Sequence, residues 1–413
     1  MATKEPMEAQ VVIVDWKDLV ATDEHESPSF SSPDLANALE AAYGSTGTGI
    51  LAIRNVPDFL EAKNAFLPMA HNLISLPKEY LENELTDPDS LYNAGWSHGK
   101  EKLRADQPDF AKGSFYFNPI TDLPGTPQDR QDYPLSYPAN KWPDQTRIPN
   151  FRPAAQRLGQ ILKDAVVALS HHVDALAQAK IGKGESSSSS YPTNFLYDTM
   201  KDTDKVKGRL LYYFPLAESS KSDDTEVAED SWIGWHNDSG FFTALAGDLY
   251  VDHTTGRLVE CPDPSAGLYV VDRQDRLLRV TIPSDCLAIQ MGECTQIVTG
   301  GTVTATPHCV RGVSNNPSVA RISLACFVDT PPTFPLAVPK SSTVQDVLEK
   351  SSTTNRVPPL KNRWTRDGMS FGDFLRETFQ TYYEWANRTK TELASINVQD
   401  KEGEEKLEGL MES

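Results

Sequence analysis

The sequence predicts an α+β fold in which a jelly roll of short strands is wrapped by N- and C-terminal helices. The first observation is a series of short apolar runs between about residues 206 and 332, separated by Gly, Pro and Asn. Short strands at such regular spacing are typical of a β-sandwich or barrel. The second is a long amphipathic pattern over residues 154–180, which predicts a helix packed on a large body.

The other elements follow from local patterns along the chain. Strands are predicted at residues 11–15, 49–54, 210–214, 231–235, 241–246, 267–271, 277–282, 287–291, 295–298 and 321–329, and helices at 32–43, 154–180 and 364–385. The region 57–153 is rich in Pro, Asp, Asn and aromatic residues, so we expect ordered loops there, including 92–96 and 115–119. The charged tail from residue 398 is expected to be loose.

Composition limits the classes of function. The formal net charge of −19, from 39 basic and 58 acidic residues, disfavours general electrostatic binding to the phosphate backbone of nucleic acid. No apolar run approaches the roughly 20 residues that a membrane helix needs, and the N-terminus does not resemble a secretory signal. The five cysteines form no Cys-x-x-Cys pair, so we expect reduced, mostly buried thiols. These observations predict a cytoplasmic protein without an obligate protein partner.

A candidate metal site lies in His236-Asn237-Asp238, at the end of a predicted strand. Residues two apart in a strand point to the same face, so His236 and Asp238 would lie side by side. A third ligand would come from His308. Two histidines and one carboxylate bind one face of Fe(II) and leave positions for oxygen and a cosubstrate.

The His-x-Asp pattern alone is weak, because it occurs twice. His172-Val173-Asp174 matches it as well, but lies in the predicted helix 154–180, where residues two apart do not face each other. Taken alone, His236 would be a hydrogen-bonded histidine at a strand end, with Asp238 capping a turn.

A candidate carboxylate site follows His308 in the predicted strand 321–329. Arg321 and Ser323 share one face of this otherwise apolar strand. A guanidinium binds a carboxylate in bidentate fashion, and a neighbouring hydroxyl adds a donor, so the pair could hold the far carboxylate of a dicarboxylate such as 2-oxoglutarate. Taken alone, an Arg321 paired with an acidic residue at a sheet edge is about as plausible.

The order of these motifs resembles the plant and fungal 2-oxoglutarate/Fe(II) oxygenases related to isopenicillin N synthase. The resemblance is carried by the segments 209–215, 236–243, 267–270 and 292–300 together with His308 and 321–323, and covers about residues 206–332. A fainter match covers roughly residues 11–60, and the match over 57–153 is poor.

The resemblance implies a double-stranded β-helix that binds Fe(II), 2-oxoglutarate and O2, with ascorbate as a possible reductant. His236, Asp238 and His308 would bind iron, and Arg321 and Ser323 the 2-oxoglutarate carboxylate. Tyr213 would add a hydroxyl contact, although a one-residue slip in the alignment would exchange it for Tyr212. The substrate would be a small organic molecule that is hydroxylated or desaturated, with release of succinate and CO2.

The resemblance also divides the chain into three parts. Residues 1–205 would complete the barrel and form the substrate side, residues 206–332 would form the catalytic jelly roll, and residues 333–413 a C-terminal helical extension with a loose acidic tail. The chain departs from the family at residues 248–266, which lengthen the gap between the ligands and predict an inserted hairpin or solvated loop. Glu293 replaces a frequent aspartate, and we interpret it as structural.

Two other functions remain open on the sequence. An oxidase of the isopenicillin N synthase type would use iron and oxygen without 2-oxoglutarate, with Arg321 and Ser323 holding a substrate carboxylate instead. A jelly-roll binding protein would use the same site without catalysis, although it would have no chemical need for all five residues. A zinc hydrolase is disfavoured, because no Glu or third His stands at hydrolase spacing.

Overall fold

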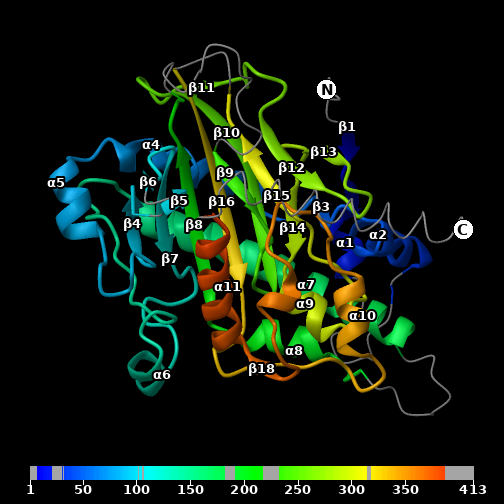
Figure 1. The fold of residues 1–413 in the computed structure, drawn as a ribbon. Coiled ribbons are helices and arrows are strands. Elements are labelled where there is room, and N and C mark those ends of the chain that lie inside the picture. Colours follow the sequence, from blue (N-terminus) through cyan, green and yellow to red (C-terminus); the bar gives the residue numbers. More distant parts are fainter. Residues whose placement is uncertain are drawn as a thin grey trace, which may run out of the picture.

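Two β-sheets form the centre of the protein, and helices pack around them (Figure 1). The computed structural model describes residues 7–20, 30, 32–100, 102–104, 107–181, 191–216, 232–313 and 318–386. The tail from residue 398, for which we expect a loose chain, lies outside these residues. The combination of helices with several sheets confirms the α+β class.

The larger sheet contains nine strands among the described residues, in the order β2-β3-β14-β10-β16-β8-β7-β4, with β11 paired to β10. Its strands are β2 (Val12–Asp15), β3 (Ile50–Arg54), β4 (Gly95–His98), β7 (Lys112–Phe117), β8 (Val206–Tyr213), β10 (Phe242–Asp252), β11 (Leu258–Val259), β14 (Leu287–Met291) and β16 (Val319–Val328). All pairs are antiparallel except β2 with β3. The strands β2, β3, β4 and β7 from the N-terminal half therefore belong to the same sheet as strands after residue 206.

The smaller sheet has the order β1-β13-β12-β15-β9 in the described part of the chain. Its strands are β1 (Met7–Gln10), β9 (Ile233–His236), β12 (Gly267–Val271), β13 (Leu277–Thr281) and β15 (His308–Arg311). Two short ribbons lie outside these sheets: β5 (Lys102–Arg104) with β6 (Gln107–Pro108), and β17 (Pro335–Leu336) with β18 (Met369–Ser370).

The two sheets face each other across one apolar cluster. Val270 and Val310 of the smaller sheet and Ala52, Ala288 and Leu211 of the larger sheet are buried in the same cluster. Alternate residues of each strand point to opposite faces, so this cluster fixes which side chains face the space between the sheets. We call these faces the inner faces.

Helices cover the outer face of the larger sheet. The longest of them, α7 (Phe151–Ile181), packs on β10 and β16, and its buried residues share a second cluster with Ile322 and Leu324 of β16. The amphipathic pattern over 154–180 thus predicted this helix correctly. Burial of this apolar stripe on one sheet face holds the helical layer in place.

The remaining helices are shorter. They are α1 (Trp16–Leu19), α2 (Pro33–Tyr43), α3 (Phe59–Phe66), α4 (Met69–Ile74), α5 (Lys78–Tyr80), the π-helix η1 (Leu81–Leu85), α6 (Pro127–Asp132), α8 (Phe195–Asp202), α9 (Glu293–Val298), α10 (Val344–Glu349), the 3-10 helix η3 (Leu360–Asn362) and α11 (Phe371–Ala386). In Figure 1, α11 is the red helix in front of the sheets.

Several sequence predictions of secondary structure were wrong. The predicted strand at 295–298 is part of helix α9, because a short buried apolar run has no periodicity that separates strand from helix. The predicted helix at 364–385 begins only at Phe371, after Gly368 with a left-handed φ of 70°. The expected loops at 92–96 and 115–119 contain strand residues of β4 and β7.

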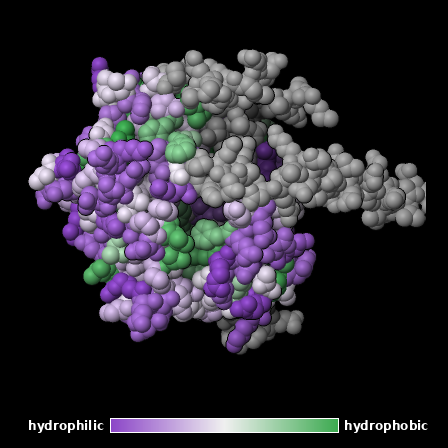
Figure 2. All heavy atoms as spheres, turned by 60° about the vertical axis from the view of Figure 1, so that its left-hand side comes forward, coloured by the Kyte–Doolittle hydropathy of each residue, from purple (hydrophilic) through white to green (hydrophobic). Residues whose placement is uncertain are grey.

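The surface is largely hydrophilic. Figure 2 shows one face on which hydrophilic side chains dominate and hydrophobic ones gather around a hollow. No helix among the described residues is both long and apolar enough to cross a bilayer. None of the five cysteines forms a disulfide, and all except Cys261 are buried, in agreement with the expectation of reduced thiols.

The second His-x-Asp pair is part of the helical layer. In α7, His172 Nε2 lies 2.9 Å from the carbonyl oxygen of Leu19. The buried Asp174 carboxylate accepts hydrogen bonds from Tyr191 Oη at 2.7 Å and from the backbone N–H groups of Leu196 and Tyr197, both at 3.0 Å. Asp174 therefore holds the first turn of α8.

We predict that Asp174→Ala lowers the free energy of unfolding by about 2–4 kcal/mol, because it leaves buried donors without an acceptor. Urea denaturation measures this loss. Asp164→Ala, at an exposed position of the same helix, is the control and should change stability by less than about 0.5 kcal/mol. Equal stabilities of the two variants would contradict the structural role of Asp174.

Candidate metal centre

The pairing of β9 with β15 brings the two predicted histidine ligands together. In this antiparallel pair, His308 stands directly opposite His236, and Val310 stands opposite Ile233. Val310 belongs to the cluster between the sheets and Ile233 packs against it. Since residues two apart share a face, His308 is on the inner face as well.

The three predicted ligands form one compact cluster. Asp238 Oδ1 lies 3.8 Å from His236 Nε2 and 3.9 Å from His308 Nε2. The nearest potential ligand atoms of all three residues lie within 4.8 Å of one another, and no other group of three or more such residues is found in the described chain. Asp238 and His308 are buried, whereas 31% of the His236 side chain is accessible.

The second nitrogen of each imidazole sets its tautomer. His236 Nδ1 lies 2.8 Å from the carbonyl oxygen of Gly234, and His308 Nδ1 lies 3.1 Å from that of Thr306. A carbonyl oxygen only accepts, so both Nδ1 atoms carry the hydrogen and both Nε2 lone pairs are available to a metal.

Burial and charge keep His236 neutral. The pKa of His236 is lowered to about 4, chiefly by burial and then by the neighbouring His308, with a smaller contribution from Arg209, while Asp238 and the hydrogen bond to Gly234 act in the opposite direction. A neutral imidazole is the form that binds a metal.

The donor set fits a divalent transition metal. It offers two neutral imidazole nitrogens and one carboxylate, and Asp238 Oδ2 is buried without a hydrogen-bond partner among the described residues. A buried carboxylate oxygen without a partner is costly unless a cation compensates it. Two histidines and one carboxylate are the ligand set of non-haem Fe(II) oxygenases.

A buried ion pair fixes the loop that carries the ligands. The Glu293 carboxylate accepts hydrogen bonds from Arg363 Nη1 and Nη2, each at 2.5 Å, and from Asn237 Nδ2 at 2.8 Å. Asn237 stands between two of the ligands, and its backbone N–H donates to Tyr382 Oη of α11 at 3.0 Å. Glu293 is thus structural in a specific sense: its carboxylate connects the metal-binding loop to the C-terminal segment.

Arg321 of β16 lies on the inner face of the opposite sheet. It stands opposite Tyr213 of β8 and Tyr250 of β10 in the strand register, and its guanidinium carbon lies 4.6 Å from the centre of the Tyr213 ring. Ser323, two residues on, stands opposite Leu211, which belongs to the inner cluster. The structure therefore places Arg321, Ser323 and Tyr213 on the sheet that faces the metal cluster, whereas Tyr212 points to the helical side.

Arg321 has one acidic partner and two free donors. Its Nη2 donates to Asp248 Oδ1 at 2.5 Å, whereas Nε and Nη1 are buried without a partner among the described residues. Burial lowers the pKa of Arg321, but Asp248, Tyr213 and Tyr250 more than offset this effect, so the pKa is raised. The guanidinium stays charged and can donate to one more carboxylate.

Sequence reasoning missed Asp248 as a partner of Arg321. We expected a hairpin or solvated loop over 248–266, but β10 continues to Asp252 and pairs with the short strand β11. A bulge between Leu245 and Asp248 shifts the register, so that Asp248 stands opposite Ser323. Bulges re-aim side chains in this way, and the available sequence signal was only Gly247, whose φ is 36°.

His253, which we did not assign as a ligand, is remote from the cluster. Its Nδ1 is 2.9 Å from Tyr212 Oη, and its carbonyl oxygen is 3.0 Å from His71 Nε2. It belongs to the outer face of the larger sheet.

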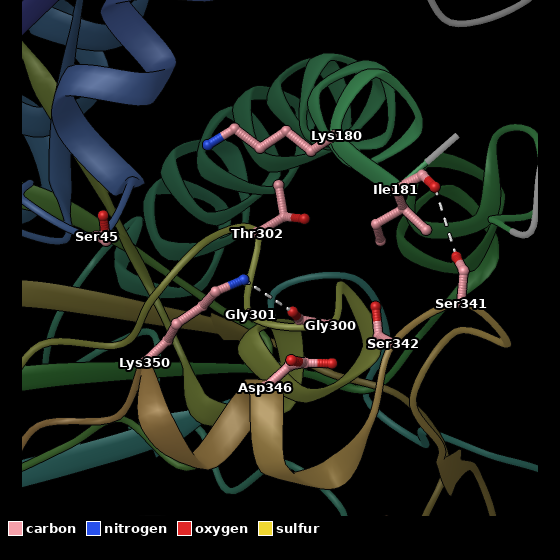
Figure 3. Close-up of a pocket in the computed structure, with 10 residues that line it drawn as sticks. All are labelled: Ser45, Lys180, Ile181, Gly300, Gly301, Thr302, Ser341, Ser342, Asp346 and Lys350. Carbon is pink, nitrogen blue, oxygen red and sulfur yellow. Dashed lines mark hydrogen bonds between the residues drawn. The ribbon is translucent and has the colours of Figure 1, made fainter. Parts of the chain in front are cut away.

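A polar cavity of about 250 Å³ lies elsewhere, between the ends of α7 and α10 (Figure 3). Its two lysines have other partners, because Lys180 pairs with Glu40 and Lys350 Nζ donates to the carbonyl oxygen of Gly300 at 3.4 Å. None of the predicted site residues lines it. Its lining residues are Ser45, Lys180, Ile181, Gly300, Gly301, Thr302, Ser341, Ser342, Asp346 and Lys350.

Solved structures of oxygenases share this fold. A full-length Neurospora crassa protein crystallised with α-ketoglutarate aligns with a TM-score of 0.59 at 16% identity, over 90% of this chain and 96% of its own. A Caulobacter crescentus protein described as a putative 2OG-Fe(II) oxygenase aligns with a TM-score of 0.58 at 17% identity, over 90% and 98%. JOX2, crystallised with 2OG, Fe and JA, aligns with a TM-score of 0.55 at 17% identity, over 90% and 86%.

Comparison by sequence identifies no relatives of this kind. No family profile matches the chain, and no curated protein matches it. At these low identities the similarity shows the fold: the chain has the fold of the 2-oxoglutarate/Fe(II) oxygenases, and the resemblance drawn from its motifs is confirmed at that level.

We predict that His236→Ala weakens Fe(II) or Mn(II) binding by about 100-fold or more, since even loss of an outer partner of a metal ligand costs roughly 10–100-fold. Calorimetric titration of the metal measures the change. His253→Ala is the matched control and should bind as the wild type does. Unchanged affinity in His236→Ala would exclude this cluster as the metal site.

We predict that Arg363→Met lowers the free energy of unfolding by about 3–5 kcal/mol, because it leaves the buried Glu293 carboxylate unpaired. Guanidinium denaturation of the metal-free protein measures this loss, and metal titration should show weaker binding. In the control, Arg376→Met removes an exposed pair with Asp373 and should cost less than about 1 kcal/mol. A similar small effect in both variants would contradict a bracing role for the buried pair.

Proposed function

We propose that this protein is an Fe(II)- and 2-oxoglutarate-dependent oxygenase that hydroxylates or desaturates a small organic molecule and releases succinate and CO2. One observation carries the proposal above all: a partly unsatisfied guanidinium, Arg321, lies on the sheet that faces a three-residue metal cluster. The first feature fits an anionic cosubstrate and the second fits the metal that the cosubstrate would chelate. Both are held by the same pair of sheets.

The architecture supports a jelly-roll core. Two facing, mostly antiparallel sheets with the candidate site between them are what a double-stranded β-helix provides. In the proposed division, residues 206–332 are the catalytic core, residues 1–205 complete the sheets and form the substrate side, and residues 333–413 brace the metal loop through Arg363 and Tyr382.

Each residue of the site would have a simple task. His236, Asp238 and His308 would hold iron, which would supply oxygen activation and electron transfer when bound. Arg321 would hold the far carboxylate of 2-oxoglutarate, Ser323 would add a donor, and Tyr213 would fix the guanidinium plane through its ring. Apolar neighbours such as Leu211 and Val310 would keep water away from this space.

Asp248 gives the proposed clamp an additional partner. It accepts a hydrogen bond from Nη2 of the guanidinium and leaves Nε and Nη1 for the cosubstrate. It would therefore hold Arg321 in place before the cosubstrate binds, which reduces the conformational entropy lost on binding.

Solved structures with this fold also contain small molecules other than the cosubstrate. The Neurospora crassa protein was crystallised with thymine and with 5-formyluracil. This supports a small-molecule substrate for the present chain without identifying it. Ascorbate would serve as a reductant in the assay.

We predict that the Fe(II)-loaded protein converts 2-oxoglutarate to succinate, and that Arg321→Met raises the KM for 2-oxoglutarate by about 10-fold or more, because it removes a charge-assisted hydrogen bond. Succinate formation at varied 2-oxoglutarate concentration measures both values. Arg157→Met, which removes an exposed arginine paired with Glu61, is the control and should leave the KM unchanged.

The same assay separates the alternatives. Oxygen uptake that does not depend on 2-oxoglutarate would favour an oxidase, and the absence of succinate above background with metal bound would favour a binding protein. Either result would contradict the proposal.

A further inference from the structure

A row of cationic side chains follows the inner face of β8. Lys207 and Arg209 alternate with Gly208 and Leu210, and they share their face with Tyr213. Leu210 belongs to the cluster on the helical side, so Lys207 and Arg209 point toward the space between the sheets. The chain as a whole has a net charge of −19, which makes a local pair of cations in this space notable.

This row lies at the metal end of the larger sheet. Lys207 stands opposite Phe327 and Arg209 opposite Ala325, near the end of β16. The metal-binding loop enters the sheet at the same end, because Phe242 at the start of β10 stands opposite Val328. The backbone N–H of Phe241, close after the ligands, also donates to Asp329 directly beyond β16.

The row is too far from Arg321 to serve the same ligand. Lys207 stands opposite Phe327, six residues along β16 from Arg321. At about 3.3 Å per residue, six residues span about 20 Å, several times the length of a five-carbon dicarboxylate. A dicarboxylate bound to Arg321 therefore cannot reach Lys207, so Lys207 is available to a different ligand.

Lys207 has polar and aromatic neighbours but no anionic partner. Its Nζ donates to Asn93 Oδ1 at 3.2 Å and lies 5.8 Å from the centre of the Tyr116 ring. The same ring lies 5.2 Å from the guanidinium carbon of Arg209, so the two cations flank one aromatic side chain. Among the described residues, no carboxylate lies within ion-pairing distance of Lys207.

The electrostatic environment of Lys207 is unfavourable without an anion. The pKa of Lys207 is lowered to about 7, chiefly by burial and also by the positive charges of Lys205 and Arg209, while Asp329 acts in the opposite direction. Lys207 is nevertheless only half-buried by accessible surface, so part of its side chain is open to solvent. A bound anion would stabilise the ammonium form of Lys207 in this environment.

We propose that Lys207 binds a carboxylate group of the primary substrate, so that the substrate is a small organic acid held with its carboxylate on β8 beside the metal centre. This inference rests on the proposed function, which it extends from a small organic molecule to an acid.

Charge favours a carboxylate over a phosphate monoester. Asp329 and Asp238 lie near the same end of the sheet and act on each other through their negative charges. These negative charges repel a doubly charged phosphate more strongly than a singly charged carboxylate, whose charge matches that of the single Lys207 ammonium.

The test uses the full chain loaded with Ni(II) and 2-oxoglutarate, which binds ligands without turnover. Calorimetry compares hexanoate, phenylacetate and 4-phenylbutyrate with their primary amides, and phenylacetate with phenyl phosphate. We expect at least one acid to bind about 10-fold or more tightly than its amide, the usual value of a charge-assisted hydrogen bond.

Variants then assign the preference to Lys207. Lys207→Met should remove the preference for the acid and leave the amide affinity unchanged, and Lys207→Arg should retain it. Lys78→Met, at an exposed position of α5, is the control and should have no effect. The comparison of acid with amide in the wild type decides the proposal even if a Lys207 variant does not fold.

Three results would overturn the inference. Equal affinities of acid and amide in all three pairs would exclude a carboxylate site, and tighter binding of phenyl phosphate than of phenylacetate would assign the site to phosphate monoesters. A loss of 2-oxoglutarate affinity in Lys207→Met with unchanged acid affinity would assign the cation to the cosubstrate. Failure of the proposed function is separate, because it appears as absent succinate formation by the Fe(II) protein.

Discussion

The antiparallel pairing of β9 with β15 is the constraint on which the rest of the site depends. It sets His236 opposite His308, and the chain then turns so that Asp238 meets both imidazoles. A shift of one residue in either strand would move a histidine to the opposite face and separate the ligands. The apolar cluster between the sheets opposes such a shift, because Val310 and its neighbours would lose their buried positions.

Several contacts outside the ligands maintain this geometry. Glu293 and Arg363 form a buried pair that holds Asn237, and Tyr382 accepts the backbone N–H of the same residue. The C-terminal segment is thereby coupled to the metal loop, although it is distant in sequence. On the opposite sheet, the bulge in β10 directs Asp248 toward Arg321. Both features place charged side chains in the interior with their partners already in position, which is how a rigid site is preorganised.

The sequence predicted the parts of the site that depend on local spacing. The strand context of His236 and the shared face of Arg321 and Ser323 follow from the two-residue period of a strand. Asp238 lies beyond the end of β9, so the loop and not the strand period brings it to His236, and that part of the strand argument was wrong. The pair His172 and Asp174 lies in a helix, as predicted. The α+β class and the long helix α7 were predicted for the same reason, because long periodic patterns are unambiguous.

The features that sequence missed depend on contacts between distant segments. No local pattern shows that Arg363 pairs with Glu293, or that a bulge brings Asp248 to Arg321. The short buried run at 295–298 lacks the length to distinguish a helix from a strand, and β4 and β7 are recognised only by their pairing within the sheet. The position of Lys207 near the metal loop likewise follows only from the pairing of β8 with β16, in which it stands opposite Phe327.

The central claim is that the metal cluster and Arg321 bind one cosubstrate between them. Anaerobic titration of the Fe(II)-loaded protein with 2-oxoglutarate tests it most directly, because a 2-oxo acid that chelates Fe(II) gives a visible charge-transfer absorption. The account predicts this absorption in the wild type, its absence in Asp238→Ala, and saturation only at higher 2-oxoglutarate concentration in Arg321→Met. A wild-type protein that binds Fe(II) but gives no absorption at saturating 2-oxoglutarate would contradict the account.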